Sequence, residues 1–257
     1  MWRNIRIAIL LLILLFVALN TYFDRVYSTD WDIPLRVAVY PINADGSAQS
    51  ERFIGELAAD HFLAIESFFD SEAREYGLEM ERPVRILKGA QLRELPPSVA
   101  PNAGALSIAW WSLMTRYWAW RAAENPNGIP PDIKLFLLYH DPESSPALPH
   151  SIGMQKGLLG IVNLFADRAM MGSNDTVMAH ELLHTLGATD KYDLRTTRPL
   201  HPVGYAEPDR QPLHPQQYAE LMGGRIPITD ERAEIPESLS EVLIGPETAT
   251  EVGWTKR

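Results

Sequence analysis

The 257-residue sequence contains no cysteine, and this absence removes several possibilities at once. Without thiols the chain forms no disulfide, has no cysteine-based latency switch, and must build any metal site from His, Asp or Glu side chains. Basic residues are also in the minority, with 23 Lys and Arg against 33 Asp and Glu, so the net charge is −10. A surface of this sign repels a phosphate backbone, and we expect no nucleic-acid partner.

Long hydrophobic runs are scarce, and the clearest one lies near the start of the sequence. Arg3 and Arg6 precede residues 7–19, which are apolar throughout, and the uncharged stretch continues to Phe23. This length suits a membrane span, which needs about 17–25 residues, and basic residues hold the preceding end on the cytoplasmic side. Because residues 18–20 make a poor cleavage site, we expect residues 1–23 to be an uncleaved signal anchor.

Such an anchor places the following domain on the periplasmic or extracellular side of a membrane. The alternative is a cleaved signal peptide and a secreted protein. Residues 24–33 are expected to form a linker, and residues 34–257 a single domain.

The spacing of apolar residues predicts the order of elements in this domain. Strands are expected at 35–40, 84–87, 133–139, 151–155 and 160–165. Helices are expected at 50–76, 106–123, 173–186 and 246–252, the third capped by Ser173, Asn174 or Asp175. This order predicts an α+β fold of α/β-like character, in which helices pack on a mixed sheet. Residues 192–235 are rich in Pro, His, Arg and Gly and are expected to be mostly irregular.

Four tryptophans cluster on the second predicted helix, at positions 110, 111, 118 and 120. Packing of these large aromatic side chains on the sheet is the favoured interpretation. A belt at a membrane interface, beside the predicted anchor, is the alternative.

The most informative stretch of the chain is His180-Glu181-Leu182-Leu183-His184-Thr185-Leu186-Gly187-Ala188-Thr189-Asp190. On a helix, residues four apart share a face, so His180 and His184 can bind one metal ion. Glu181 can reach a metal-bound water as a general base. Gly187 lets the chain leave the helix, so Asp190 can return as a third ligand, with Asp193 as a rival for this position.

This segment resembles the signature of the metzincin peptidases, with aspartate in place of their usual third histidine. The variant is similar to that of immune inhibitor A-type and snapalysin-type peptidases. Met222, followed by two glycines, is similar to the Met-turn of metzincins, although Gly224 stands where some of them have a tyrosine. The predicted helix at 106–123 also departs from their usual order of elements.

The resemblance implies a zinc-dependent endopeptidase that hydrolyses protein or peptide substrates. Zn²⁺ is expected on His180, His184 and Asp190, with Glu181 as the catalytic base. The fold implied is a twisted mixed sheet whose antiparallel edge strand, at 151–155, binds extended substrate. Residues 34–187 then form an upper subdomain, and residues 188–257 form a lower subdomain that carries the Met-turn.

Three alternatives stay open on the sequence alone. A gluzincin-type hydrolase would use a downstream glutamate, such as Glu207 or Glu220, as its third ligand. A membrane-anchored binding or scaffold protein could retain a peptidase fold without activity. Hydrolysis of an amide in a non-protein substrate, such as a cell-wall peptide, is the third. Tyr192 is interpreted as a packed tyrosine rather than a group that stabilises an oxyanion.

Overall fold

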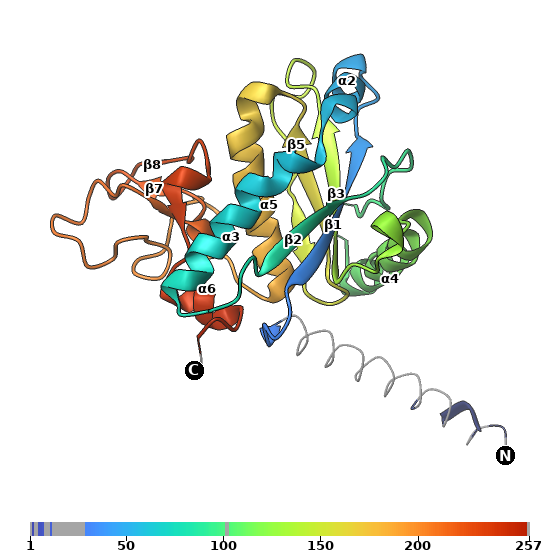
Figure 1. Ribbon diagram of the computed structural model, residues 1–257, viewed down its shortest axis with the longest axis horizontal. Helices are drawn as coiled ribbons and strands as arrows, with labels where there is room; N and C mark the ends of the chain where they lie inside the picture. Colours follow the sequence, from blue (N-terminus) through green and yellow to red (C-terminus); the bar gives the residue numbers. More distant parts are fainter. Residues whose placement is uncertain (1, 3–4, 8–10, 12–28, 101–102, 256–257) are drawn as a thin grey trace.

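The computed structural model describes residues 2, 5–7, 11, 29–100 and 103–255 (Figure 1). The predicted signal anchor and the first part of the predicted linker lie almost entirely outside these residues. Among the residues described, no helix has both the length and the apolar character needed to cross a membrane.

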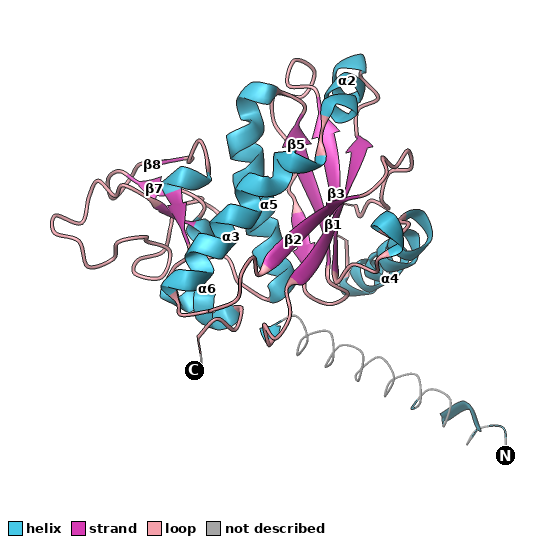
Figure 2. Cartoon of the chain, viewed as in Figure 1, coloured by secondary structure: helices cyan, strands magenta, loops and turns pink. Residues whose placement is uncertain are grey.

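A five-stranded sheet forms the centre of the molecule (Figure 1, Figure 2). In spatial order its strands are β2 (Val84–Lys88), β1 (Leu35–Asn43), β3 (Ile133–His140), β5 (Leu159–Phe165) and β4 (Ile152–Met154). The first four are parallel, whereas β4 runs antiparallel to β5 at one edge. The predicted mixed sheet with an antiparallel edge strand is therefore confirmed.

Helices cover both faces of this sheet (Figure 2). One face carries α2 (Ala48–Glu56), α3 (Leu63–Glu75) and α5 (Met171–Leu186), and the other carries α4 (Ala105–Ala122), which η2 (Pro126–Gly128) follows. Successive side chains of a strand point to opposite faces. Val37 and Val39 accordingly join the core under α3 and α5, whereas Ala38 and Tyr40 join the core under α4.

The tryptophan cluster on α4 is divided between the core and the surface. Trp118 is buried, and its ring centroid lies 4.5 Å from that of Phe136 in β3. Trp110 and Trp120 point outward and are 62% and 73% exposed. The expected packing on the sheet therefore holds for part of the cluster only.

The single helix predicted at 50–76 is wrong. The chain leaves the helical conformation at Leu57, and η1 (Ala59–Phe62) separates α2 from α3. Leu57 is buried, and its carbonyl accepts a hydrogen bond from Lys88 Nζ. Apolar residues thus continue at helical spacing across the break, so the pattern gives no sign of it.

The predicted cap of the 173–186 helix is also wrong. This helix, α5, begins at Met171, directly after η3 (Arg168–Met170), whose cap is Asp167. The side chain of Asn174 instead bonds to both backbone groups of Phe165, which ties the first turns of α5 to the end of β5.

The C-terminal part is mostly irregular, as predicted. Its short elements are β6 (Ala219–Glu220), η4 (Leu221–Gly223), β7 (Ile226–Pro227), β8 (Ala233–Glu234), η5 (Leu239–Glu241), β9 (Val242–Leu243) and α6 (Pro246–Glu251). Trp31, within the predicted linker, is buried against Trp254, and its Nε1 donates to the carbonyl of Val252 at 2.7 Å. The packed domain therefore includes this part of the segment.

Candidate metal centre

Helix α5 carries two of the predicted ligands on one face and ends where the motif requires. Gly187 adopts a left-handed conformation, with φ of 104°. The N–H groups of Gly187 and Ala188 bond to the carbonyls of His184 and Leu183, which closes the helix. A side chain at position 187 would also lie 2.3 Å from the Gln155 amide. Glycine is therefore favoured by the left-handed turn, whereas the flexible end of Gln155 could move away from a larger side chain.

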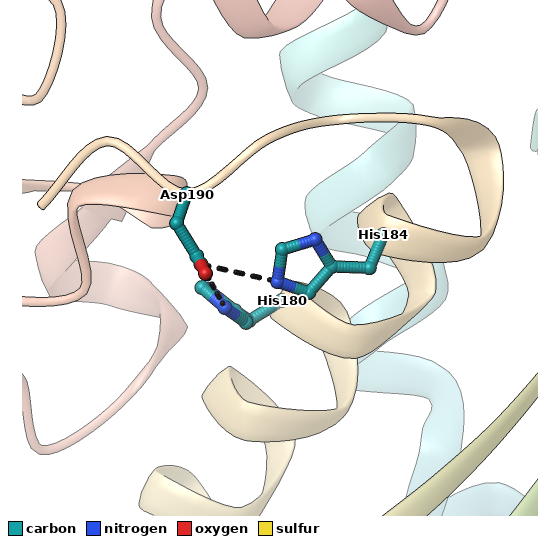
Figure 3. A group of neighbouring side chains, drawn as sticks. All are labelled: His180, His184 and Asp190. Carbon is teal, nitrogen blue, oxygen red and sulfur yellow. Dashed lines mark ion pairs between the residues drawn. The ribbon is translucent and has the colours of Figure 1, made fainter. Parts of the chain in front are cut away.

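The turn brings the carboxylate of Asp190 back to the two histidines (Figure 3). Asp190 Oδ1 lies 3.3 Å from His180 Nε2 and 3.1 Å from His184 Nε2. Two ligand atoms bound to one zinc ion at tetrahedral angles would lie about 3.3–3.5 Å apart. The three donors are therefore spaced to share one ion.

The tautomers of the two histidines are fixed by backbone carbonyls. His180 Nδ1 lies 3.0 Å from the carbonyl oxygen of Leu221, and His184 Nδ1 lies 2.9 Å from that of Ala188. A carbonyl only accepts, so each Nδ1 carries a proton, and in the metal-binding tautomer the lone pair of each Nε2 points toward Asp190. Such partners orient the histidines of metal sites.

In this tautomer the three donor atoms offer lone pairs to a common point. Asp190 Oδ1 is buried and has no hydrogen-bond partner among the described residues. Burial acts to raise the pKa of Asp190, but the two imidazoles, in their protonated form, outweigh it and hold this pKa well below its usual range. A cation would satisfy all three donors, so these residues fit a metal ion.

The loop that presents Asp190 is anchored on both sides by one residue of α6. Glu251 accepts hydrogen bonds from the backbone N–H of Thr189 at 3.0 Å and from its hydroxyl at 2.7 Å. It also forms a 2.7 Å ion pair with Lys191, whose side chain is only 3% exposed. The residues before and after the candidate ligand are therefore held by the same carboxylate.

A tight turn at residues 219–224 lies beneath this centre. Met222 is fully buried, its carbonyl accepts from the N–H of Lys191, and the next-door carbonyl of Leu221 orients His180. The buried carboxylate of Glu220 accepts hydrogen bonds from the N–H groups of Gly223 and Gly245 and from the Thr248 hydroxyl. Helix α6 and the residue before it thus secure the turn as well as the ligand loop.

Glu181 lies beside the ligands and has an unused carboxylate oxygen. Its Oε2 is buried and has no hydrogen-bond partner among the described residues. Burial raises the pKa of Glu181, and the nearby imidazoles partly offset this effect. The edge strand β4 approaches very closely, since a Cβ on Gly153 would lie 2.5 Å from the carbonyl oxygen of Glu181. Oε2 of the Glu181 carboxylate is therefore free to accept a proton.

A cavity of about 390 Å³ opens onto Glu181 and His180. Its walls come from α5, the segment before β4, the ligand loop and the residues that follow the Met222 turn. Tyr192 also faces it, and burial raises the pKa of this tyrosine to about 12, so the phenol is neutral. A second cavity, between α2, η1 and η3, contains none of the predicted site residues.

The structure distinguishes between the residues that the sequence offered as third ligand. Asp193 accepts hydrogen bonds from the N–H groups of Arg195 and Thr196 and does not belong to the metal-binding group. Glu207 pairs with Arg210 instead. Glu220, as described above, is fully engaged by the turn and α6.

Sequence reasoning missed the anchoring roles of Glu220 and Glu251. Apart from Gly223, their partners lie 25 to 62 residues away, so no local pattern signals them.

No protein-family model matches the chain, and no curated protein matches it either. Function is therefore inferred from the geometry of the centre and its cavity.

Proposed function

We propose that this protein is a zinc-dependent peptidase that follows the metzincin plan. The observation that carries the proposal is the convergence of His180, His184 and Asp190 next to the unpaired Oε2 of Glu181, with His180 and Glu181 lining an open cavity. Three protein ligands and one open position are typical of catalytic rather than structural zinc. The fully buried Met222 in a turn beneath the ligands supports the same plan.

His180, His184 and Asp190 would hold the zinc ion. When bound, zinc supplies a Lewis acid that polarises the scissile carbonyl and lowers the pKa of its water to about 7. Glu181 Oε2 accepts a proton from the attacking water and passes it to the leaving amine, so that the carboxylate is regenerated. Its burial and raised pKa favour both steps, because the protonated form is then a less costly intermediate.

The edge strand β4 is well placed to bind an extended peptide. It pairs with β5 on one side only, and in the described part of the chain no strand pairs with its other side. An extended substrate can add to such an edge through backbone hydrogen bonds. The contact of Gly153 with α5 keeps this strand against the helix that carries Glu181.

We further propose that residues 1–23 anchor the protein in a membrane, with the peptidase domain exported. The basic residues Arg3 and Arg6 and the uncharged stretch that follows them support this. A cleaved signal peptide is the alternative, and the mass of the mature N-terminus separates the two.

Cleavage of casein and metal content of the purified full chain test the peptidase proposal. We expect about one zinc ion per wild-type chain, and an equal content in Glu181→Gln with cleavage lowered by at least about 1000-fold. Asp190→Ala is expected to lose zinc, whereas Asp193→Ala retains it.

Normal turnover by Glu181→Gln would end the assignment of the base. A zinc-loaded wild-type chain that cleaves neither casein nor a peptide library would instead favour the binding or scaffold function. Loss of zinc in Glu220→Ala but not in Asp190→Ala would favour the gluzincin plan.

A further inference from the structure

An arginine in the candidate cleft has no role in the proposed reaction. Arg225 lines the same cavity as His180 and Glu181, and its side chain is half-buried. Within the residues that the structure describes, its guanidinium forms no ion pair or hydrogen bond. Arg210 pairs with Glu207, and Arg232 pairs with Glu234.

The backbone holds Arg225 in a fixed position. The preceding Gly224 has φ of +72° and donates to the carbonyl of Glu220 at 3.0 Å, while the following Ile226 pairs with Glu234 in the β7–β8 ladder. Four residues span at most about 14 Å, so Arg225 lies within this distance of Leu221, whose carbonyl contacts His180. Because Arg225, His180 and Glu181 line one cavity, a substrate that fills this cavity lies beside all three residues.

The surroundings make an unpaired guanidinium there an effective anion site. The cavity is walled largely by apolar side chains, among them Val177, Leu194, Leu221 and Ile235. Among the described residues that line the cavity, Glu181 is the only one with a carboxylate. A half-buried cation gains most from a partner that replaces its lost hydration, and guanidinium binds carboxylates with two parallel hydrogen bonds. The net charge of −10 would otherwise repel acidic substrates.

We propose that Arg225 is a specificity-determining residue that binds a carboxylate of the substrate within a few residues of the scissile bond. The inference rests on the proposed peptidase function and names its substrate class as acidic peptides. The carboxylate belongs either to an Asp or Glu side chain or to the C-terminus of the peptide.

Matched peptides test this proposal on the full chain. Internally quenched peptides carry Glu, Gln, Leu or Lys at single positions around the cleavable bond, each with a free and an amidated C-terminus. The wild type is expected to prefer carboxylate-bearing peptides in kcat/KM, and Arg225→Met is expected to lower this preference by about 10- to 100-fold, the effect of losing a hydrogen bond between charged groups. Arg225→Glu should reverse the preference, so that lysine-bearing peptides are cleaved best. The control is Arg85→Met, on β2 far from the cavity, which should leave the preference unchanged.

A preference that survives amidation assigns the carboxylate to a side chain, and one that amidation abolishes assigns it to the C-terminus. The proposal is overturned if the wild type does not discriminate Glu from Gln or free from amidated ends, or if Arg225→Met and Arg225→Glu keep the preference. If no peptide is cleaved, fluorescence anisotropy measures binding of the same peptides. Binding that depends on both Arg225 and a carboxylate then supports the anion site, although the peptidase proposal fails. If no such binding is measured, the proposed anion site is overturned.

Discussion

Replacing Glu251 by alanine should destabilise the protein strongly, although this residue touches neither the cleft nor the candidate ligands. The change leaves the ammonium of Lys191, 3% exposed, without its counter-charge. Removing one partner of a buried ion pair costs about 3–5 kcal/mol. Lys191 Nζ keeps contacts of 3.1 and 3.3 Å with the carbonyl and hydroxyl of Thr189, so we expect the lower end of this range.

Urea unfolding of the full chain in mild detergent, with a chelator present, measures this cost without the contribution of bound metal. Glu247→Ala is the matched control, because Glu247 lies on the same helix but is exposed. The double variant Glu251→Ala/Lys191→Met should be more stable than Glu251→Ala alone, since it removes the stranded charge. A cost below about 1 kcal/mol for Glu251→Ala, or a double variant that is less stable than the single one, would refute the reasoning.

The same substitution should weaken metal binding, because Glu251 holds the residues on both sides of Asp190. Loss of such outer contacts typically lowers affinity by about 10- to 100-fold. Competition with a zinc-chelating dye measures the change directly, and an unaltered affinity would show that the ligand loop keeps its position without this anchor.

Two further substitutions test other parts of the description. Gly153→Ala adds a Cβ 2.5 Å from the backbone oxygen of Glu181 and from His184 Cβ. We expect the free energy of unfolding in urea to fall by about 1–3 kcal/mol, and zinc affinity to fall as well. Gly55→Ala is the control, because a Cβ there lies in open space and should cost nothing. Asp175→Asn tests a dependence of stability on pH. Burial raises the pKa of Asp175 from 3.8 to about 7, so between pH 4 and 7 the folded state holds a proton that the unfolded state releases. The free energy of unfolding of the wild type therefore falls as the pH rises through this range, by up to about 4 kcal/mol. The Asn variant should lose this slope relative to the wild type, and parallel stability profiles for the two proteins would contradict the assignment.

The sequence predicts most of the sheet because its strands are short apolar runs between clear turn signals. The central position of β3 agrees with the strongly apolar character of residues 133–139, whereas the edge position of β4 is implied only by the resemblance to metzincins. The sequence also predicts which side chains converge at the centre. The spacing of His180 and His184 fixes their common face, and Gly187 forces the turn that returns Asp190.

The parts that the sequence does not predict depend on distant contacts. The break at Leu57 is hidden because a buried leucine fits both a helix and the extended bend that Lys88 contacts. The role of Glu220 shows the same limit. As a sequence feature it is a rival ligand, and only the fold reveals that Thr248 and two backbone amides occupy its oxygens.

The fastening of both the ligand loop and the Met222 turn by residues 245–251 has a consequence for biosynthesis. A nascent polypeptide that has emerged only as far as the histidine motif lacks Glu251 and Thr248, so its ligand loop and turn are still untethered. The candidate metal centre can therefore be completed only after residues 245–251 have been synthesised. Under the proposed peptidase function, a nascent chain that lacks them is expected to be inactive.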